Sequence, residues 1–191
     1  MMVDQDAIRE ATRALLAAIG EDPDRDGLRR TPDRVARSWA ELVRGYDEDP
    51  RDHLRTTFAV DSKELVLVRD IEFRTLCEHH LLPFSGHAHV AYLPSGGRVT
   101  GLSKIGRLVE GYARRLQVQE RLTTQVADAV EEMLAPRGLA VIMQAEHLCM
   151  SMRGVAKPGA TTLTSVFRGE LDSAQGRSEL FGLIGMSGLH R

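Results

Sequence analysis

The spacing of the apolar residues changes near Leu65, and no other feature of the sequence limits the fold as strongly. Before that point apolar residues recur every three or four positions, which is typical of helices. One helix is expected to end at Gly20. A second is expected to begin with Thr31 as its N-cap and Pro32 in its first turn, and to stop at Gly45. From Leu65 onward, stretches of alternating apolar and polar residues indicate strands.

Two longer helices interrupt this strand-forming part of the chain. One is expected to run from Ser103, as a hydroxyl cap, to about Leu116, and the next to run from Val118 to Pro136. Strands are expected at residues 65–69, 71–76, 87–93, 98–101, 139–145 and 161–168, the fourth returning through a turn at 94–97 to pair with the third. A short helix is expected near Leu180. The order of strands, two helices and strands predicts an α+β layer fold rather than a βαβ alternation.

The overall charge excludes one large class of proteins. The 191 residues carry a net charge of −2, whereas a general nucleic-acid-binding protein has a basic excess. No apolar run approaches the length of a transmembrane helix, and the N-terminus lacks the apolar core of a signal peptide. The two cysteines lie among histidines, which is typical of metal or catalytic residues in a reducing compartment. We therefore expect a cytoplasmic protein with no nucleic-acid or membrane partner.

Both cysteines belong to short clusters that also contain histidine, Cys77-Glu78-His79-His80 and His147-Leu148-Cys149. Thiolate and imidazole are ligands that Zn²⁺ prefers, and three protein ligands plus a water are typical of a catalytic zinc. Alternatively, a free cysteine packs as a small buried hydrophobe. Because the second cluster also pairs a cysteine with a histidine, it strengthens the case for a metal site. A histidine that does not bind the metal would transfer protons or hydrogen-bond a ligand.

Several cations could form an anion site. Ser103 and Lys104 are expected in the first turn of a helix, with Arg107 one turn on, and a helix N-terminus attracts anions. Arg153 follows the second cysteine cluster, and its planar guanidinium is suited to phosphate. Arg34 and Arg37 are three residues apart on the second N-terminal helix, where a solvated helix face is the simpler explanation.

Two further pairs of polar residues have competing explanations. Gln119 and Glu120 together could read the Watson–Crick edge of a purine, but a glutamate that interacts with the helix dipole is favoured from the residues alone. His87 and His89 share a strand face and could bind a metal, although partly buried structural histidines are the commoner case.

Five motifs together resemble the signature of GTP cyclohydrolase I. They occur in the family's order, and the similarity runs from about Thr31 to Gly169. They are Cys77-Glu78-His79-His80-Leu81-Leu82-Pro83-Phe84, Gly101-Leu102-Ser103-Lys104, Gln117-Val118-Gln119-Glu120-Arg121-Leu122-Thr123, His147-Leu148-Cys149-Met150 and Met152-Arg153-Gly154-Val155.

The resemblance implies a fold and an assembly. Members of this family adopt the tunnelling fold, a four-stranded antiparallel sheet with two helices on one face, preceded by a helical N-terminal region. Here that implies a helical region at residues 1–60 and a catalytic domain at 61–191, working as one functional unit. The subunits associate through their sheets into a ring, typically a decamer, with active sites at subunit interfaces. The family opens the imidazole ring of GTP and recyclises the product to 7,8-dihydroneopterin triphosphate, with release of formate.

The resemblance also implies roles for individual residues. The implied Zn²⁺ ligands are Cys77, His80 and Cys149. The residues implied to act in catalysis, by moving protons or contacting the reacting ribose end, are His79, His147, Glu120 and Ser103. Those implied to bind guanine, ribose or triphosphate are Gln119, Glu120, Ser103, Lys104, Arg107, Arg153, Arg34 and Arg37. A catalytically silent relative would not need the full set of metal ligands, and other enzymes of the fold would lack either these ligands or the triphosphate-binding cations.

Overall fold

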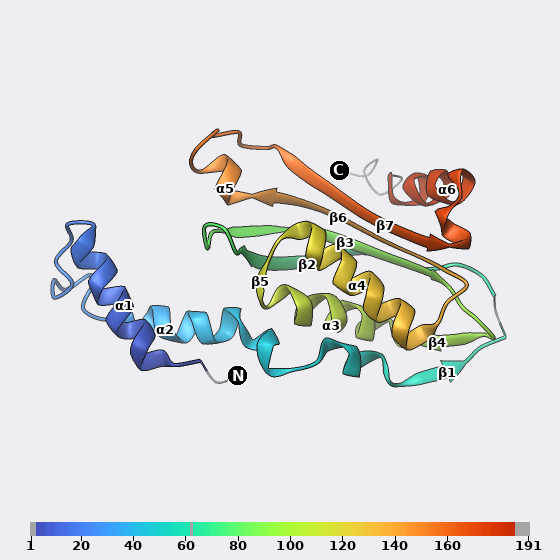
Figure 1. Cartoon of the computed structure of the whole chain (residues 1–191), viewed down its shortest axis with the longest axis horizontal. Coiled ribbons are helices and arrows are strands. Elements are labelled where there is room, and N and C mark those ends of the chain that lie inside the picture. The colour runs from blue at the N-terminus through green and yellow to red at the C-terminus, as the bar shows by residue number, and fades with distance from the viewer. Residues whose placement is uncertain (1–2, 62, 186–191) are drawn as a thin grey trace.

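The computed structural model describes residues 3–61 and 63–185, which form a body built on one sheet and a helical arm that projects from it (Figure 1). The arm consists of helices α1 (Gln5–Ala18) and α2 (Thr31–Leu42), so two helices lie where the sequence predicts them. The predicted N-cap of the second helix is wrong. Thr31 is already helical and Arg30 is the cap residue, because the turn before it continues into the helix through a bond from the Thr31 N–H to the Leu28 carbonyl.

The body contains a five-stranded sheet in the order β5-β2-β3-β6-β7. Its four longer strands are antiparallel: β2 (Val66–Cys77), β3 (Pro83–Leu93), β6 (Gly138–His147) and β7 (Thr161–Gly169). The two-residue strand β5 (Leu116–Gln117) pairs in parallel with the end of β2, so the sheet is mixed rather than wholly antiparallel. The prediction of an α+β fold is confirmed.

Helices α3 (Leu102–Ala113) and α4 (Gln119–Leu134) cover one face of the sheet and enclose the main core. Strand residues with one parity, such as Val90 and Val141, point into this core. Their neighbours, such as Ala91 and Ala140, contribute to a smaller core on the opposite face, over which α6 (Ala174–Gly185) packs. The remaining short elements are the 3₁₀ turns η1 (Arg44–Asp47), η2 (Pro50–Leu54) and η3 (Glu170–Asp172) and the one-turn helix α5 (Leu148–Ser151).

Two predictions about the middle of the chain are wrong. Strand β4 (Arg98–Thr100) pairs with β1 (Thr57–Ala59) and not with β3, so a small second sheet joins the body to the segment after the arm. Helix α3 begins two residues earlier than expected, with Gly101 rather than Ser103 as its cap, and Ser103 makes no capping bond. The helix also ends at Ala113, because the chain must turn there to form β5.

Strand β2 is one strand with an irregularity rather than two strands. Its pairing with β3 shifts between Val68 and Ile71, and Asp70 has a left-handed backbone (φ 59°). The Asp70 N–H donates to Nδ1 of the buried His89 at 3.1 Å. The His89 side chain therefore accepts from a bulge N–H that would otherwise have no partner in the strand ladder.

Gly86 allows β3 and β6 to approach closely. A Cβ atom at this position would lie 1.9 Å from the carbonyl oxygen of Gln144 in β6, so no side chain fits. Two residues along, Phe84 is paired with His147 at the same end of the two strands. This end of the sheet also carries Cys77, the last residue of β2.

In the part of the chain described here, no helix has the length and apolar character needed to cross a bilayer.

Candidate metal centre and active site

Cys77 and His80 are held together by a tight turn at the end of β2. The Cys77 N–H donates to the Leu82 carbonyl, and the Leu81 N–H donates to the Cys77 carbonyl, each at 2.8 Å. Leu81 adopts a left-handed backbone (φ 56°), which closes the turn. The turn orients His80 toward the cysteine rather than leaving it at a random point of the loop.

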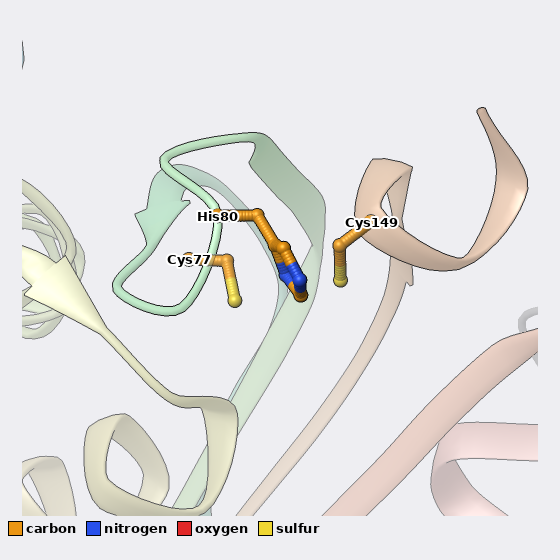
Figure 2. Close-up of side chains that lie close together, drawn as sticks. All are labelled: Cys77, His80 and Cys149. Atoms are coloured by element: carbon orange, nitrogen blue, oxygen red, sulfur yellow. The ribbon is translucent and has the colours of Figure 1, made fainter. Parts of the chain in front are cut away.

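Cys149 reaches the same place from the other cysteine cluster. Strand β6 ends at His147 and the chain immediately forms α5, which carries Cys149. Potential ligand atoms of Cys77, His80 and Cys149 all lie within 4.8 Å of one another, and their side chains converge (Figure 2). Two thiolates bound to one zinc ion are about 4 Å apart because each Zn–S bond is ~2.3 Å. The two sulfurs and one nitrogen therefore fit a zinc-type cation in number, type and spacing.

The electrostatics of the thiols also favour a cation. Burial raises the pKa of the Cys149 thiol, and the neighbouring Cys77 raises it further. Two adjacent thiolates are costly on their own, whereas a divalent cation stabilises both.

The guanidinium of Arg153 donates to His80 Nε2 at 3.1 Å, so one of the predicted phosphate-binding cations lies beside the cluster.

His79 lies next to the cluster without being part of it. Its Nδ1 is 3.7 Å from Cys77 Sγ, and its side chain is exposed to solvent. An exposed imidazole at this distance can exchange protons with solvent and with a molecule bound at the metal. His80 is therefore a member of the cluster and His79 is not, whereas their different roles stay a prediction.

His147 is fixed by two contacts. Its ring stacks on Phe84, with centroids 4.3 Å apart and planes 6° apart, and its Nε2 is 2.8 Å from Gln119 Oε1. Burial lowers the pKa of His147, and the nearby carboxylate of Glu120 partly opposes this effect. A lowered pKa favours the neutral imidazole, which can accept a proton.

The side chain of Gln119 is buried and already engaged. Its Nε2 donates to the carbonyls of Met143 and Thr162, each at 3.0 Å, and lies 3.1 Å from Thr164 Oγ1. Because the Gln119 amide is buried, its position does not support the hypothesis that it reads a purine edge. Glu120, on the same helical turn, is exposed and accessible to a ligand. No local pattern predicts this bonding, because the partners are 24 to 45 residues away.

Arg121 lies beside the cluster and was not among the residues predicted from the sequence. It donates to the carboxylate of Glu78 at 2.5 Å and to the Leu116 carbonyl at 2.8 Å. The bond to Arg121 lowers the pKa of Glu78. Since Glu78 lies between Cys77 and His79, Arg121 ties the metal-binding turn to α4, the helix that carries Glu120.

The single chain does not bring the predicted triphosphate cations of α3 to the cluster. Ser103 and Lys104 lie in the first turn of a 12-residue helix, which is about 18 Å long. That helix starts after β4 and ends before β5, which pairs with Cys77, and β4 and β5 lie at opposite ends of the body (Figure 1).

The cations of the arm are equally separate. Arg34 and Arg37 are exposed on α2, and Figure 1 shows that this helix projects away from the sheet. Among the predicted cations, Arg153 alone makes a recorded contact with a metal-cluster residue in the part of the chain described here.

Comparison with known proteins adds an independent finding. The family model described as GTP cyclohydrolase I matches residues 8–185. A GTP cyclohydrolase 1 of Carboxydothermus hydrogenoformans is 56% identical over 185 residues, which cover 96% of each chain. A GTP cyclohydrolase 1 of Streptomyces coelicolor is 57% identical over 95% of this chain and 90% of its own length. A GTP cyclohydrolase 1 of Bacillus subtilis is 54% identical over 93% and 94%.

Proposed function

The chain belongs to the GTP cyclohydrolase I family, and from this we propose that Cys77, His80 and Cys149 hold the zinc ion of an enzyme that acts on GTP. The activity is the conversion of GTP to 7,8-dihydroneopterin triphosphate, with release of formate, at the start of pterin and folate biosynthesis. The convergence of two thiols and one imidazole is the observation that carries the zinc assignment. A bound zinc ion lowers the pKa of a coordinated water toward ~7, which makes hydroxide accessible at neutral pH.

The two histidines beside the cluster move protons. His79 is exposed and donates a proton to the imidazole nitrogen of the purine as that ring opens. His147 has a lowered pKa and therefore takes up a proton as the neutral ring. Their different environments support the division of labour, since one residue is solvated and the other is partly buried.

Glu120 holds the guanine edge. Its carboxylate is exposed at the start of α4 and is close enough to His147 to influence the pKa of that ring. A carboxylate accepts hydrogen bonds from the N–H donors of guanine, and it can pass a proton to a neighbouring histidine. Gln119, whose amide is buried, reaches the substrate only through His147.

The triphosphate is bound by cations from more than one subunit. Arg153 comes from the chain that carries the metal cluster, whereas Ser103, Lys104 and Arg107 of α3 are supplied by a second copy. Arg34 and Arg37 of a projecting arm add to the same site. The position of α3's first turn, which follows β4 at the end of the body opposite β5 and Cys77, supports this arrangement.

A closed ring, a decamer as in the family, completes these sites. Strands β2 and β7 carry the edges of the sheet, apart from the short stretch where β5 covers β2, and uncovered edges invite pairing with another chain. Leu15 and Ile19 on the arm are 62% and 66% exposed, although their spacing is that of a buried stripe. Residues 1–60 therefore serve as an assembly arm of one functional unit with residues 61–191.

The activity is tested by incubating the protein with GTP, oxidising and dephosphorylating the product, and measuring neopterin fluorescence. Neopterin should form in proportion to the zinc content of the preparation. Treatment with a chelator should abolish the signal, and added Zn²⁺ should restore it. A metal-free preparation that forms neopterin at the full rate would contradict the zinc assignment, and a zinc-loaded preparation that forms none would contradict the activity.

A further inference from the structure

The amide of Gln119 has only one orientation that satisfies its surroundings. Two of the three atoms near its Nε2 are backbone carbonyl oxygens, of Met143 in β6 and Thr162 in β7. Carbonyl oxygens only accept hydrogen bonds, so the NH₂ group must face them. The amide oxygen Oε1 therefore faces His147, and it too can only accept.

This orientation determines which nitrogen of His147 carries a proton. Since Gln119 Oε1 accepts, His147 Nε2 must be the donor of the 2.8 Å bond between them. In the neutral ring the lone pair is then on Nδ1. Within the described chain Nδ1 has no hydrogen-bond partner. It is also not fully buried, so this nitrogen remains accessible to solvent.

Neighbouring hydroxyl groups reinforce the same pattern. Thr123 Oγ1 donates to the Gln119 carbonyl at 2.8 Å, so in its 2.6 Å contact with Thr164 Oγ1 it is the acceptor. Thr164 in turn can accept from Gln119 Nε2 at 3.1 Å. The network links α4, β6 and β7 behind His147, and the two backbone carbonyls alone are enough to orient the amide.

We infer that Gln119 is a positioning residue that holds His147 as the tautomer protonated on Nε2, with Nδ1 as its proton-accepting atom. Stacking on Phe84 fixes the plane of the ring, and Gln119 fixes which edge of that ring faces inward. The inference rests on the proposed function, because it gives a role to a histidine that is proposed to transfer protons.

The first test needs no variant. Nitrogen-15 magic-angle-spinning spectra of the zinc-loaded protein, with His147 identified by its loss in His147→Gln, should give one protonated and one unprotonated ring nitrogen. Selective correlation to the side-chain carbons should identify the protonated nitrogen as Nε2. A ring that is protonated on Nδ1, or an equal mixture of both tautomers, would overturn the inference.

The second test compares two buried glutamines. Gln119→Met removes the amide that contacts His147, and Gln117→Met removes an equally buried amide that bonds to Tyr112, Gln125 and Arg121 instead. Gln119→Met should lower kcat by ~10–100-fold beyond Gln117→Met, as is typical for loss of a partner that orients a functional histidine. Its KM for GTP and zinc content should match those of the control.

The outcomes separate this inference from the proposed function. If His147→Gln keeps full kcat, the proposed proton transfer by His147 is wrong, and the inference falls with it. If His147→Gln is slow while the two glutamine variants have equal kcat, only the inference is wrong. If Gln119→Met does not fold, the tautomer spectrum of the parent protein still decides.

Discussion

Cys149 illustrates how the chemistry of a single residue depends on its neighbours. Burial and the adjacent Cys77 both raise its thiol pKa, so without a cation the protonated thiol is favoured at neutral pH. A divalent cation reverses this preference and releases the proton. Metal binding at the cluster is therefore expected to weaken as the pH falls, because protons and the metal compete for the same sulfur.

Cys149→Ser should lose zinc and activity but keep its fold. Serine has nearly the size of cysteine, but its hydroxyl does not provide the thiolate ligand that zinc favours. Cys149 lies in the one-turn helix α5, outside the strands of the core, so the circular dichroism spectrum should be unchanged. Zinc is measured by elemental analysis, and one full equivalent per chain in this variant would contradict the ligand assignment.

The adjacent histidines should respond differently to the same substitution. His80→Ala removes a member of the metal cluster and should lose zinc, whereas His79→Ala should keep zinc and bind GTP. Loss of a general acid or base typically lowers the rate by ~10²–10⁴-fold, so His79→Ala should turn over very slowly. If His79→Ala loses zinc as completely as His80→Ala, the two roles are reversed.

At the scale of elements, local patterns predict some features and miss others. The spacing of apolar residues is enough to find helices α1 to α4 and the long strands, and the two cysteine clusters point to the metal site. The pairing of β4 with β1 was missed because the partners are about forty residues apart and each strand is only three residues long. The Gln119–His147 bond was missed for a similar reason, since it depends on tertiary contacts that no local pattern encodes.

The bulge in β2 should make stability depend on pH. Burial lowers the pKa of His89, Asp70 opposes this effect, and His87 and Arg69 add to it. Because the pKa is lower in the folded state, the stabilising contribution is present above the ordinary value of ~6.5 and is lost as the pH falls through the folded pKa. Protonated His89 also cannot accept the Asp70 N–H.

His89→Asn should reduce this pH dependence, because asparagine offers an acceptor that does not titrate. The midpoint of urea unfolding should fall less between about pH 7.5 and pH 5.5 in the variant than in the parent protein. Zinc loss at low pH affects both proteins, so the difference between them isolates His89. An equal fall in both proteins would rule out His89 as a source of the effect.

Ala135→Gly should stabilise the end of α4. Ala135 is the C-cap of that helix with a left-handed backbone (φ 43°), and its side chain is exposed. Glycine adopts this conformation without the steric cost that alanine incurs, so the free energy of unfolding should rise by ~0.5–1 kcal/mol. The check is the urea midpoint, and a lower midpoint in the variant would contradict the expectation.

At the scale of the whole molecule, two features of the single chain favour the proposed ring. Its sheet has edges that can pair with another chain, and α3 directs Lys104 to the end of the body opposite Cys77. The proposed ring accounts for both features, because each chain pairs its sheet edges with neighbouring chains and supplies Lys104 to the site of another chain. Light scattering should therefore find a large assembly, and a fully active monomer would exclude it.

Mixing two impaired variants tests the shared site directly. Cys149→Ser removes a proposed metal ligand, and Lys104→Ala removes a proposed triphosphate cation. If these residues serve one site from different chains, mixed rings contain some sites with both groups intact, about one quarter for random mixing. Co-expression should then restore neopterin formation. No recovery in verified mixed rings would mean that each chain forms its own site.

The close approach at Gly86 has a consequence for sequence variation. Since even a methyl group there would lie 1.9 Å from the Gln144 carbonyl oxygen, no other amino acid can be accommodated without separating β3 from β6. Such a separation would pull Phe84 away from His147 two residues further along. In a library that samples all twenty amino acids at this position, selection for function should therefore return glycine alone, although Gly86 is not one of the proposed metal or substrate ligands.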